Sequence, residues 1–205
     1  MGGVYSSFVK RPLDIIVSFG LIIVLSPLLL MLAGLVVIHL GRPVIFKQQR
    51  PGLHAKPFYI YKFRTMMGRY NPQGNPVPDV VRLTRFGRVV RSTSLDELPQ
   101  LFNILRGHMS FVGPRPLLFK YLPYYTDEER IRHSVRPGLT GLAQVNGRNF
   151  ATWDKRLKLD VQYAKNITFL LDARIVLLTL KRVLKRQDVA RNPQFMKSLD
   201  KERGL

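Results

Sequence analysis

The chain has 205 residues, enough for one domain with its own hydrophobic core. It carries 33 lysines and arginines against 13 acidic residues, a formal net charge of +20, which indicates a polyanionic partner such as nucleic acid, anionic lipid or a phosphorylated substrate. It contains no cysteine, which excludes disulfides, thiolate zinc sites and cysteine nucleophiles. The four histidines lack metal-ligand spacing, so a hard ion held by carboxylate and phosphate oxygens fits better than a transition metal.

Residues 13–40 form an almost wholly apolar stretch. As a helix rising about 1.5 Å per residue, it is long enough to cross a hydrocarbon core of roughly 30 Å. No small-residue cleavage site follows it, so a cleaved signal peptide fits poorly. The sequence predicts that this stretch lies in a membrane.

Ser26 and Pro27 fall in the middle of the apolar stretch, where proline removes a backbone hydrogen bond and clashes with the preceding turn. Both flanks are basic, and positive charge beside a membrane segment favours the cytoplasmic side. A helix-break-helix that enters one leaflet and returns places both basic flanks on the cytoplasmic side. A spanning helix with a proline kink is the alternative.

The pattern from Pro43 onward is typical of a soluble α/β domain. Two β-branched or aromatic runs, 44–48 and 58–64, flank a turn-rich segment and predict a hairpin. Glycine, proline and asparagine predict a loop at 68–79. The remaining predicted elements are helices at 80–91, 94–106, 116–134 and 153–164 and a short strand at 142–145.

A basic amphipathic helix is predicted near the C-terminus, with an apolar stripe at Ala173, Val176, Leu177, Leu180 and Leu184. Such a helix can lie in a membrane interface with its cations at lipid headgroups, or it can pack on its own domain and leave its basic face in water. The predicted organisation is a membrane segment at 1–42, a cytoplasmic domain at 43–192 and a disordered tail at 193–205.

Asp96 and Glu97 are two adjacent carboxylates in this basic chain. Ser94 and Glu97 have the spacing of a helix capping box, in which both acids would merely start a helix. In the functional alternative, the same helix start binds a phosphate group. Asp96 can then attack phosphorus, and the neighbouring Glu97 can hold a divalent cation.

Three arginines are candidate phosphate ligands: Arg91, Arg115 and Arg148. In so basic a chain a single arginine is usually a solvated surface charge. Arg115 and Arg148 differ because each lies in a tight glycine- or proline-containing turn, which can aim a guanidinium group at phosphate oxygens. No P-loop motif is present, which excludes that kind of nucleotide site.

Ordered motifs along nearly the whole chain resemble the bacterial sugar transferases, and in particular the small single-domain group of monotopic polyprenyl-phosphate phosphoglycosyl transferases. The resemblance is carried by residues 90–103, 109–116 and 136–148, by the run 62–66, and by Ser26-Pro27. It implies a mostly helical α/β fold, with a re-entrant membrane helix broken at Ser26-Pro27 and a cytoplasmic domain that carries a β-hairpin and interfacial helices. It also implies a location at the bacterial inner membrane, facing the cytoplasm.

The resemblance further implies a reaction. A phosphosugar passes from a UDP-sugar to undecaprenyl phosphate and UMP is released, by a ping-pong mechanism in which Asp96 holds the phosphosugar covalently. Mg²⁺ would be required, with Glu97 and Asp96 at the metal, and the three arginines would bind substrate phosphates. The product would initiate assembly of a polysaccharide or another glycoconjugate.

A membrane-tethered basic protein that binds anionic lipid or nucleic acid without catalysis is the alternative. Clustered carboxylates argue against it, since a surface for polyanions has no use for them, so no nucleic-acid partner is expected. The donor sugar is not encoded in any motif, although analogy suggests an N-acetylated amino sugar. The same analogy suggests a homodimer and contact with membrane phospholipids.

Overall fold

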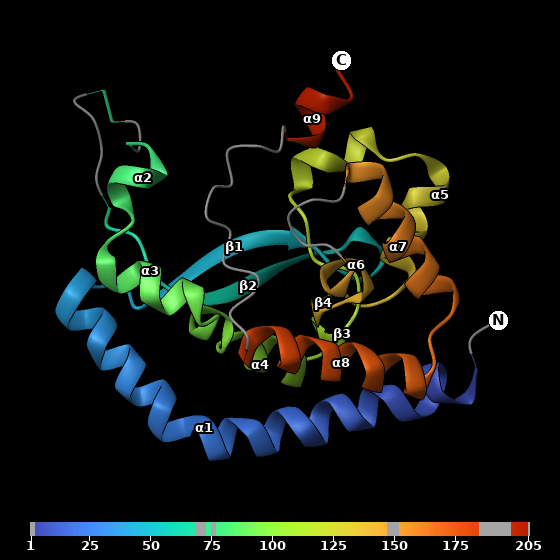
Figure 1. Cartoon of the computed structure of the whole chain (residues 1–205), viewed down its shortest axis with the longest axis horizontal. Coiled ribbons are helices and arrows are strands. Elements are labelled where there is room, and N and C mark those ends of the chain that lie inside the picture. Colours follow the sequence, from blue (N-terminus) through green and yellow to red (C-terminus); the bar gives the residue numbers. More distant parts are fainter. Residues whose placement is uncertain (1–2, 69–72, 75–76, 147–151, 185–197, 205) are drawn as a thin grey trace.

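The computed structural model describes residues 3–68, 73–74, 77–146, 152–184 and 198–204. A long N-terminal helix lies along the base of a body made of short helices around a β-hairpin (Figure 1). The described part is mostly helical, and its sheets are a two-stranded antiparallel hairpin and a two-stranded parallel pair. This agrees with the mostly helical α/β class expected from the sequence.

Helix α1 spans Lys10–Leu40 and follows a π-helical turn at Tyr5–Val9. Together they make the one helix, among the described residues, that is long and apolar enough to cross a membrane. Pro27 lies inside α1, and the helix bends about midway without being interrupted (Figure 1). The predicted break into two helices is therefore not observed. The reason is local: the Ser26 hydroxyl donates a hydrogen bond of 2.7 Å to the Ile23 carbonyl, the acceptor that Pro27 leaves without its backbone donor.

The hairpin is confirmed as β1, Ile45–Pro51, paired antiparallel with β2, Pro57–Phe63. Its inner face packs on helix α4, Gln100–Leu105. Asn103 joins these elements, because its side chain accepts a hydrogen bond from the Tyr61 amide and donates one to the Tyr59 carbonyl, at 3.0 and 2.7 Å. The fully buried Asn103 side chain thus pairs with backbone groups at the edge of β2 that a third strand would otherwise bind.

The predicted helix over 80–91 is two helices, α2 at Asp79–Arg82 and α3 at Arg85–Ser92. Leu83 between them is extended and bridges to Met66. Thr84 then caps α3 by accepting a hydrogen bond from the Gly87 amide. Gly87 is required there, since a Cβ atom would lie 1.9 Å from the Thr65 carbonyl oxygen.

Two further predictions are corrected. The predicted helix over 116–134 is a 3₁₀ turn at Phe119–Tyr124, helix α5 at Asp127–Arg130 and a 3₁₀ turn at Ile131–Ser134, because Pro123 and the capping box of Thr126 divide it. The predicted strand at 142–145 is a helical turn, α6, Leu142–Val145. The strand is instead β4, Gly138–Thr140, which pairs in parallel with β3, Ser110–Val112.

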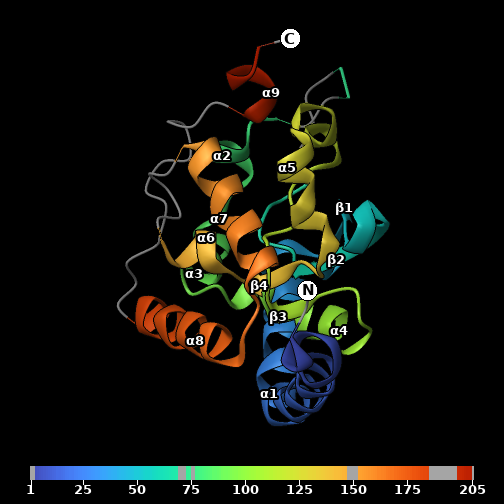
Figure 2. The ribbon, with the colours of Figure 1, turned by 90° about the vertical axis from the view of Figure 1, so that its right-hand side faces the viewer.

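Two C-terminal helices are confirmed, α7 at Trp153–Lys165 and α8 at Phe169–Leu184. Helix α8 buries Ile175 in the domain core, while Leu170, Leu177 and Leu180 stay exposed. Figures 1 and 2 show α8 beside α1 on the same side of the molecule. One side of α8 therefore packs on its own domain, and its exposed residues combine apolar side chains with the cations Arg174 and Lys181.

Residues 198–204 of the predicted disordered tail are instead ordered around a short helix, α9, Leu199–Glu202. Leu199 is fully buried against Tyr121 and Trp153. The few apolar side chains of this tail show no helical or strand periodicity, so the sequence did not predict this packing.

Candidate active site

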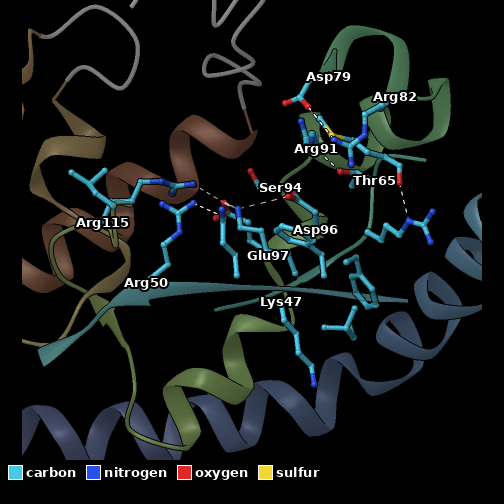
Figure 3. Close-up of a pocket in the computed structure, with 18 of the residues that line it drawn as sticks. Lys47, Arg50, Thr65, Asp79, Arg82, Arg91, Ser94, Asp96, Glu97 and Arg115 are labelled. Carbon is cyan, nitrogen blue, oxygen red and sulfur yellow. Dashed lines mark hydrogen bonds and ion pairs between the residues drawn. The ribbon is translucent and has the colours of Figure 1, made fainter. Parts of the chain in front are cut away.

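A cleft of about 1170 Å³ opens beside the hairpin. Three separate parts of the chain bring charged groups to its centre (Figure 3). Strand β2 contributes Lys62, a 3₁₀ turn at Leu95–Glu97 contributes Asp96 and Glu97, and the segment after β3 contributes Arg115. The predicted helix over 94–106 is thus a tight turn followed, after Pro99, by α4.

The capping-box alternative for the two acids is wrong. Ser94 adopts a left-handed conformation with φ of 57°, and its side chain makes no capping hydrogen bond. The Glu97 side chain does not turn back to the Ser94 amide but reaches into the cleft (Figure 3). A strained backbone at this position orients both carboxylates toward the cleft and away from a helix cap.

Glu97 is held by two cations. Its Oε1 atom lies 2.6 Å from Lys62 Nζ and 2.9 Å from Arg115 Nη2. Burial alone would raise the pKa of Glu97, but Arg115 and Lys62 outweigh burial and hold the pKa well below its ordinary value. Glu97 is therefore ionised throughout the physiological pH range.

Asp96 has a different environment although it is the adjacent residue. It is 8% exposed, and its nearest ion-pair partner, Lys62 Nζ, is 3.9 Å away. Within the described ranges no group donates a hydrogen bond to its carboxylate. Burial raises the pKa of Asp96 to about 6, opposed by Lys62 and reinforced by the negative charge of Glu97. A carboxylate without a close partner is the better nucleophile of the two, because no hydrogen bond must break before it attacks.

Two of the three predicted arginines flank these carboxylates on opposite sides (Figure 3). Arg91, at the end of α3, donates from Nε to Thr65 Oγ1 at 2.8 Å. Arg115 contacts Glu97, and both arginines lower the pKa of Asp96 through space. Arg148 lies outside the described residues. Lys62 begins the run 62–66 but was not predicted as a site residue, although its place in that motif of the hairpin could have indicated a role in the site.

The described residues contain no group of three acidic or histidine side chains that could enclose a metal. Asp96 and Glu97 offer two carboxylates. Mg²⁺ commonly takes one or two carboxylates and completes its coordination with water and substrate phosphate. The residues present therefore fit a Mg²⁺ ion bound together with a phosphorylated substrate, with Asp96 and Glu97 as its protein ligands.

A long exposed apolar helix lies beside a cleft in which a buried carboxylate without a hydrogen-bond donor among the described residues is surrounded by cations. Together they define the class: a membrane-associated enzyme for phosphorylated substrates. Comparison with known proteins identifies the family. Residues 5–186 match the family described as bacterial sugar transferase, and the chain belongs to that family.

Three relatives illustrate this membership. The chain is 51% identical over 175 residues to the uncharacterized sugar transferase EpsL of Bacillus subtilis, covering 85% of this chain and 87% of the relative. It is 41% identical to the undecaprenyl-phosphate galactose phosphotransferase of Salmonella typhimurium, covering 88% of this chain and 41% of that protein. It is 40% identical to the UDP-glucose:undecaprenyl-phosphate glucose-1-phosphate transferase of Caulobacter vibrioides, covering 85% and 69%.

Proposed function

We propose that this enzyme transfers a phosphosugar from a UDP-sugar to undecaprenyl phosphate, giving undecaprenyl-diphosphate-sugar and UMP, as the first step of polysaccharide or other glycoconjugate assembly. Family membership and the names of the relatives support the substrates. The observation that carries the mechanism is the contrast between Glu97, held by two cations, and Asp96, buried and without a hydrogen-bond donor among the described residues.

In the first half-reaction an Asp96 carboxylate oxygen attacks the β-phosphorus of the UDP-sugar. The bond from that phosphorus to the bridging oxygen breaks, and UMP leaves with the electron pair. Arg91 and Arg115 flank the attacking carboxylate and offset the charge of the phosphate oxygens. Glu97 keeps Lys62 and Arg115 in position for this contact.

In the second half-reaction an oxygen of undecaprenyl phosphate attacks the same phosphorus. The bond from phosphorus to Asp96 breaks, and the carboxylate is restored. The first displacement requires Asp96 to be ionised and the second releases it as a carboxylate, which a pKa of about 6 permits at neutral pH. Mg²⁺, when bound, would supply a positive charge that screens the carboxylates from the diphosphate.

Release of UMP is the direct test. Purified full-length enzyme is given UDP-glucose, UDP-galactose and the two UDP-N-acetylhexosamines in turn, with and without undecaprenyl phosphate. We expect sustained UMP release from at least one donor with the acceptor present, and only a stoichiometric burst without it. EDTA should stop both phases and added Mg²⁺ should restore them. A need for both substrates before any UMP appears would contradict the covalent route.

We also infer that α1 is re-entrant and that the domain faces the cytoplasm. Both ends of the helix contact the same body: Arg11 donates to the Ile104 and Leu105 carbonyls, and Val36 packs beside Phe63. A helix crossing a bilayer of about 30 Å could not keep both ends against one soluble domain. The apolar outer face of α1 and that of α8 would then lie in the same interface, against membrane phospholipids.

Single cysteines test this topology, since the chain contains none. Gly3→Cys and Lys56→Cys place a thiol at exposed positions before and after α1. With a membrane-impermeant maleimide we expect both thiols to react in inside-out vesicles and neither to react in intact spheroplasts. Labelling of the two positions from opposite faces would show that α1 spans the membrane.

A further inference from the structure

Arg50 is a cation of the cleft that the sequence motifs did not single out. It is the penultimate residue of β1, and Figure 3 shows its side chain rising from the strand to the same level as Glu97. One guanidinium nitrogen, Nη2, donates to Gln48 Oε1 at 2.6 Å. The Nε atom is shielded from solvent and has no hydrogen-bond acceptor among the described residues. A buried donor without a partner is costly unless a ligand supplies the acceptor.

The neighbour of Arg50 in the cleft is a second arginine. Arg50 and Arg115 both line the cleft, on the same side of Glu97 in the view of Figure 3, and the charge of Arg115 acts on Arg50. Burial and the positive charge of Arg115 lower the pKa of Arg50 to about 10. Arg115 is compensated by Glu97, but no carboxylate of the described residues pairs with Arg50. Two guanidinium groups that line the same cleft, one of them without a carboxylate partner among the described residues, form a site for an anion with several oxygens, such as a phosphate or diphosphate.

Another polar group near Arg115 bears on the kind of phosphate compound, because Gly141 packs against both Gly113, two residues before Arg115, and the side-chain oxygen of Gln144. Gln144 lines the cleft and is 7% exposed. Its Nε2 atom donates to the Leu139 carbonyl at 3.0 Å. This hydrogen bond fixes the amide orientation, so that Oε1 points away from that carbonyl. The Oε1 atom is buried and accepts no hydrogen bond within the described part of the chain. A ligand that reached this oxygen would have to carry an N–H or O–H donor.

A nucleotide sugar has such donors on its base, ribose and hexose, whereas polyprenyl phosphate has only hydrocarbon beyond its phosphate. The C-terminal end of α1 leads into the cleft at Arg42, two residues after Leu40, and strand β1 separates this point from Arg50. Arg64 also lines the cleft there and donates to the Arg42 carbonyl at 2.7 Å. A lipid substrate is thus closer to the Arg42 end, and a soluble nucleotide fits the end with Gln144.

We propose that Arg50 and Arg115 together bind the diphosphate of the nucleotide-sugar donor, with Gln144 accepting a hydrogen bond from the same ligand. The proposal rests on the proposed function and assigns the donor to one end of the cleft. Arg50 is then a binding residue for the donor, needed before Asp96 attacks and not for recognition of the lipid.

The test measures binding without turnover. Isothermal titration of UDP into the full-length enzyme in detergent gives a dissociation constant for the wild type and for Arg50→Gln, Arg50→Lys and Arg88→Gln. Arg88 is the matched control, because it is exposed on α3 and does not line the cleft. We expect Arg50→Gln to weaken UDP binding about tenfold or more, as loss of a charge-assisted contact does. Arg50→Lys should recover part of the affinity, because it keeps the charge without the fork, and Arg88→Gln should match the wild type.

Two further readouts separate this role from a structural one. Without ligand, Arg50→Gln should melt at a temperature no lower than that of the wild type, because the substitution removes a buried unpaired donor and a like-charge neighbour. The KM for UDP-sugar should rise in this variant by the same factor as the dissociation constant, while the KM for undecaprenyl phosphate stays within twofold.

Each other outcome points to a specific error. Unchanged UDP affinity in Arg50→Gln, with a wild type that binds UDP, would overturn the assignment and leave the proposed function intact. An increase confined to the KM for undecaprenyl phosphate would also overturn it and would place the acceptor at this end. A wild type that neither binds UDP nor releases UMP would instead refute the proposed function.

Discussion

Asp96→Asn is expected to abolish phosphosugar transfer, with a loss of at least about 10³-fold in kcat, as removal of a covalent nucleophile produces in other enzymes. The amide has the same shape but cannot form an acyl phosphate. Intact-protein mass spectrometry after mixing with UDP-sugar alone should show an added hexose phosphate on the wild type and none on the variant. Near-normal turnover in Asp96→Asn would remove Asp96 from the role of nucleophile.

The control for Asp96→Asn is its stability, which should rise. The folded protein raises the pKa of Asp96 from 3.8 to about 6, so ionisation is unfavourable for folding. The loss of folding free energy caused by ionising Asp96 is absent below pH 3.8, the unfolded pKa. It grows as the pH rises from 3.8 to about 6 and reaches its full value above that. At pH 8 it amounts to roughly 3 kcal/mol. Thermal unfolding should therefore show the variant more stable than the wild type at pH 8 and equal to it near pH 4. A variant that is inactive because it misfolds would melt at a lower temperature at both pH values.

Glu97→Gln should affect stability in the opposite direction. Loss of the carboxylate leaves Lys62 and Arg115 facing each other without the shared anion that lies 2.6 and 2.9 Å from them. Breaking a buried ion pair from one side is strongly destabilising. We expect a loss of about 2 kcal/mol, less than for a fully buried pair, because Lys62 and Arg115 retain part of their hydration. Urea unfolding at neutral pH measures this loss.

The activity of Glu97→Gln is also expected to fall, by about 10²-fold, the effect typical of losing one preorganised electrostatic contact. Arg115 loses its anchor, and Lys62 is free to pair with Asp96, which lowers the pKa of Asp96 and makes it a poorer nucleophile. Glu97→Asp is the control: it keeps the charge, so it should recover much of the stability. If Glu97→Gln were as stable and active as the wild type, the ion pairs seen at this position would have no role in the site.

Several features could be predicted from local sequence. The apolar helix, the hairpin, α7 and α8 follow from hydrophobic periodicity and turn residues within each segment. The helices at 80–91 and 116–134 were wrong because they are divided by interactions that periodicity does not show, the bridge between Leu83 and Met66 and the cap at Thr126. The bend at Pro27 without interruption is accompanied by the hydrogen bond from the Ser26 hydroxyl to the Ile23 carbonyl, which no hydropathy pattern encodes.

The sequence by itself determined that this protein has a long apolar helix, a strong positive charge and an adjacent pair of carboxylates, because composition and short motifs carry those properties. Only the tertiary structure decided what each carboxylate does. Glu97 is paired because Lys62, 35 residues away, and Arg115, 18 residues away, reach it across the cleft. Asp96 lacks such close partners because the left-handed turn at Ser94 places it 3.9 Å from the same lysine. Charge interactions depend on distances between segments far apart in the chain, and those distances exist only after folding.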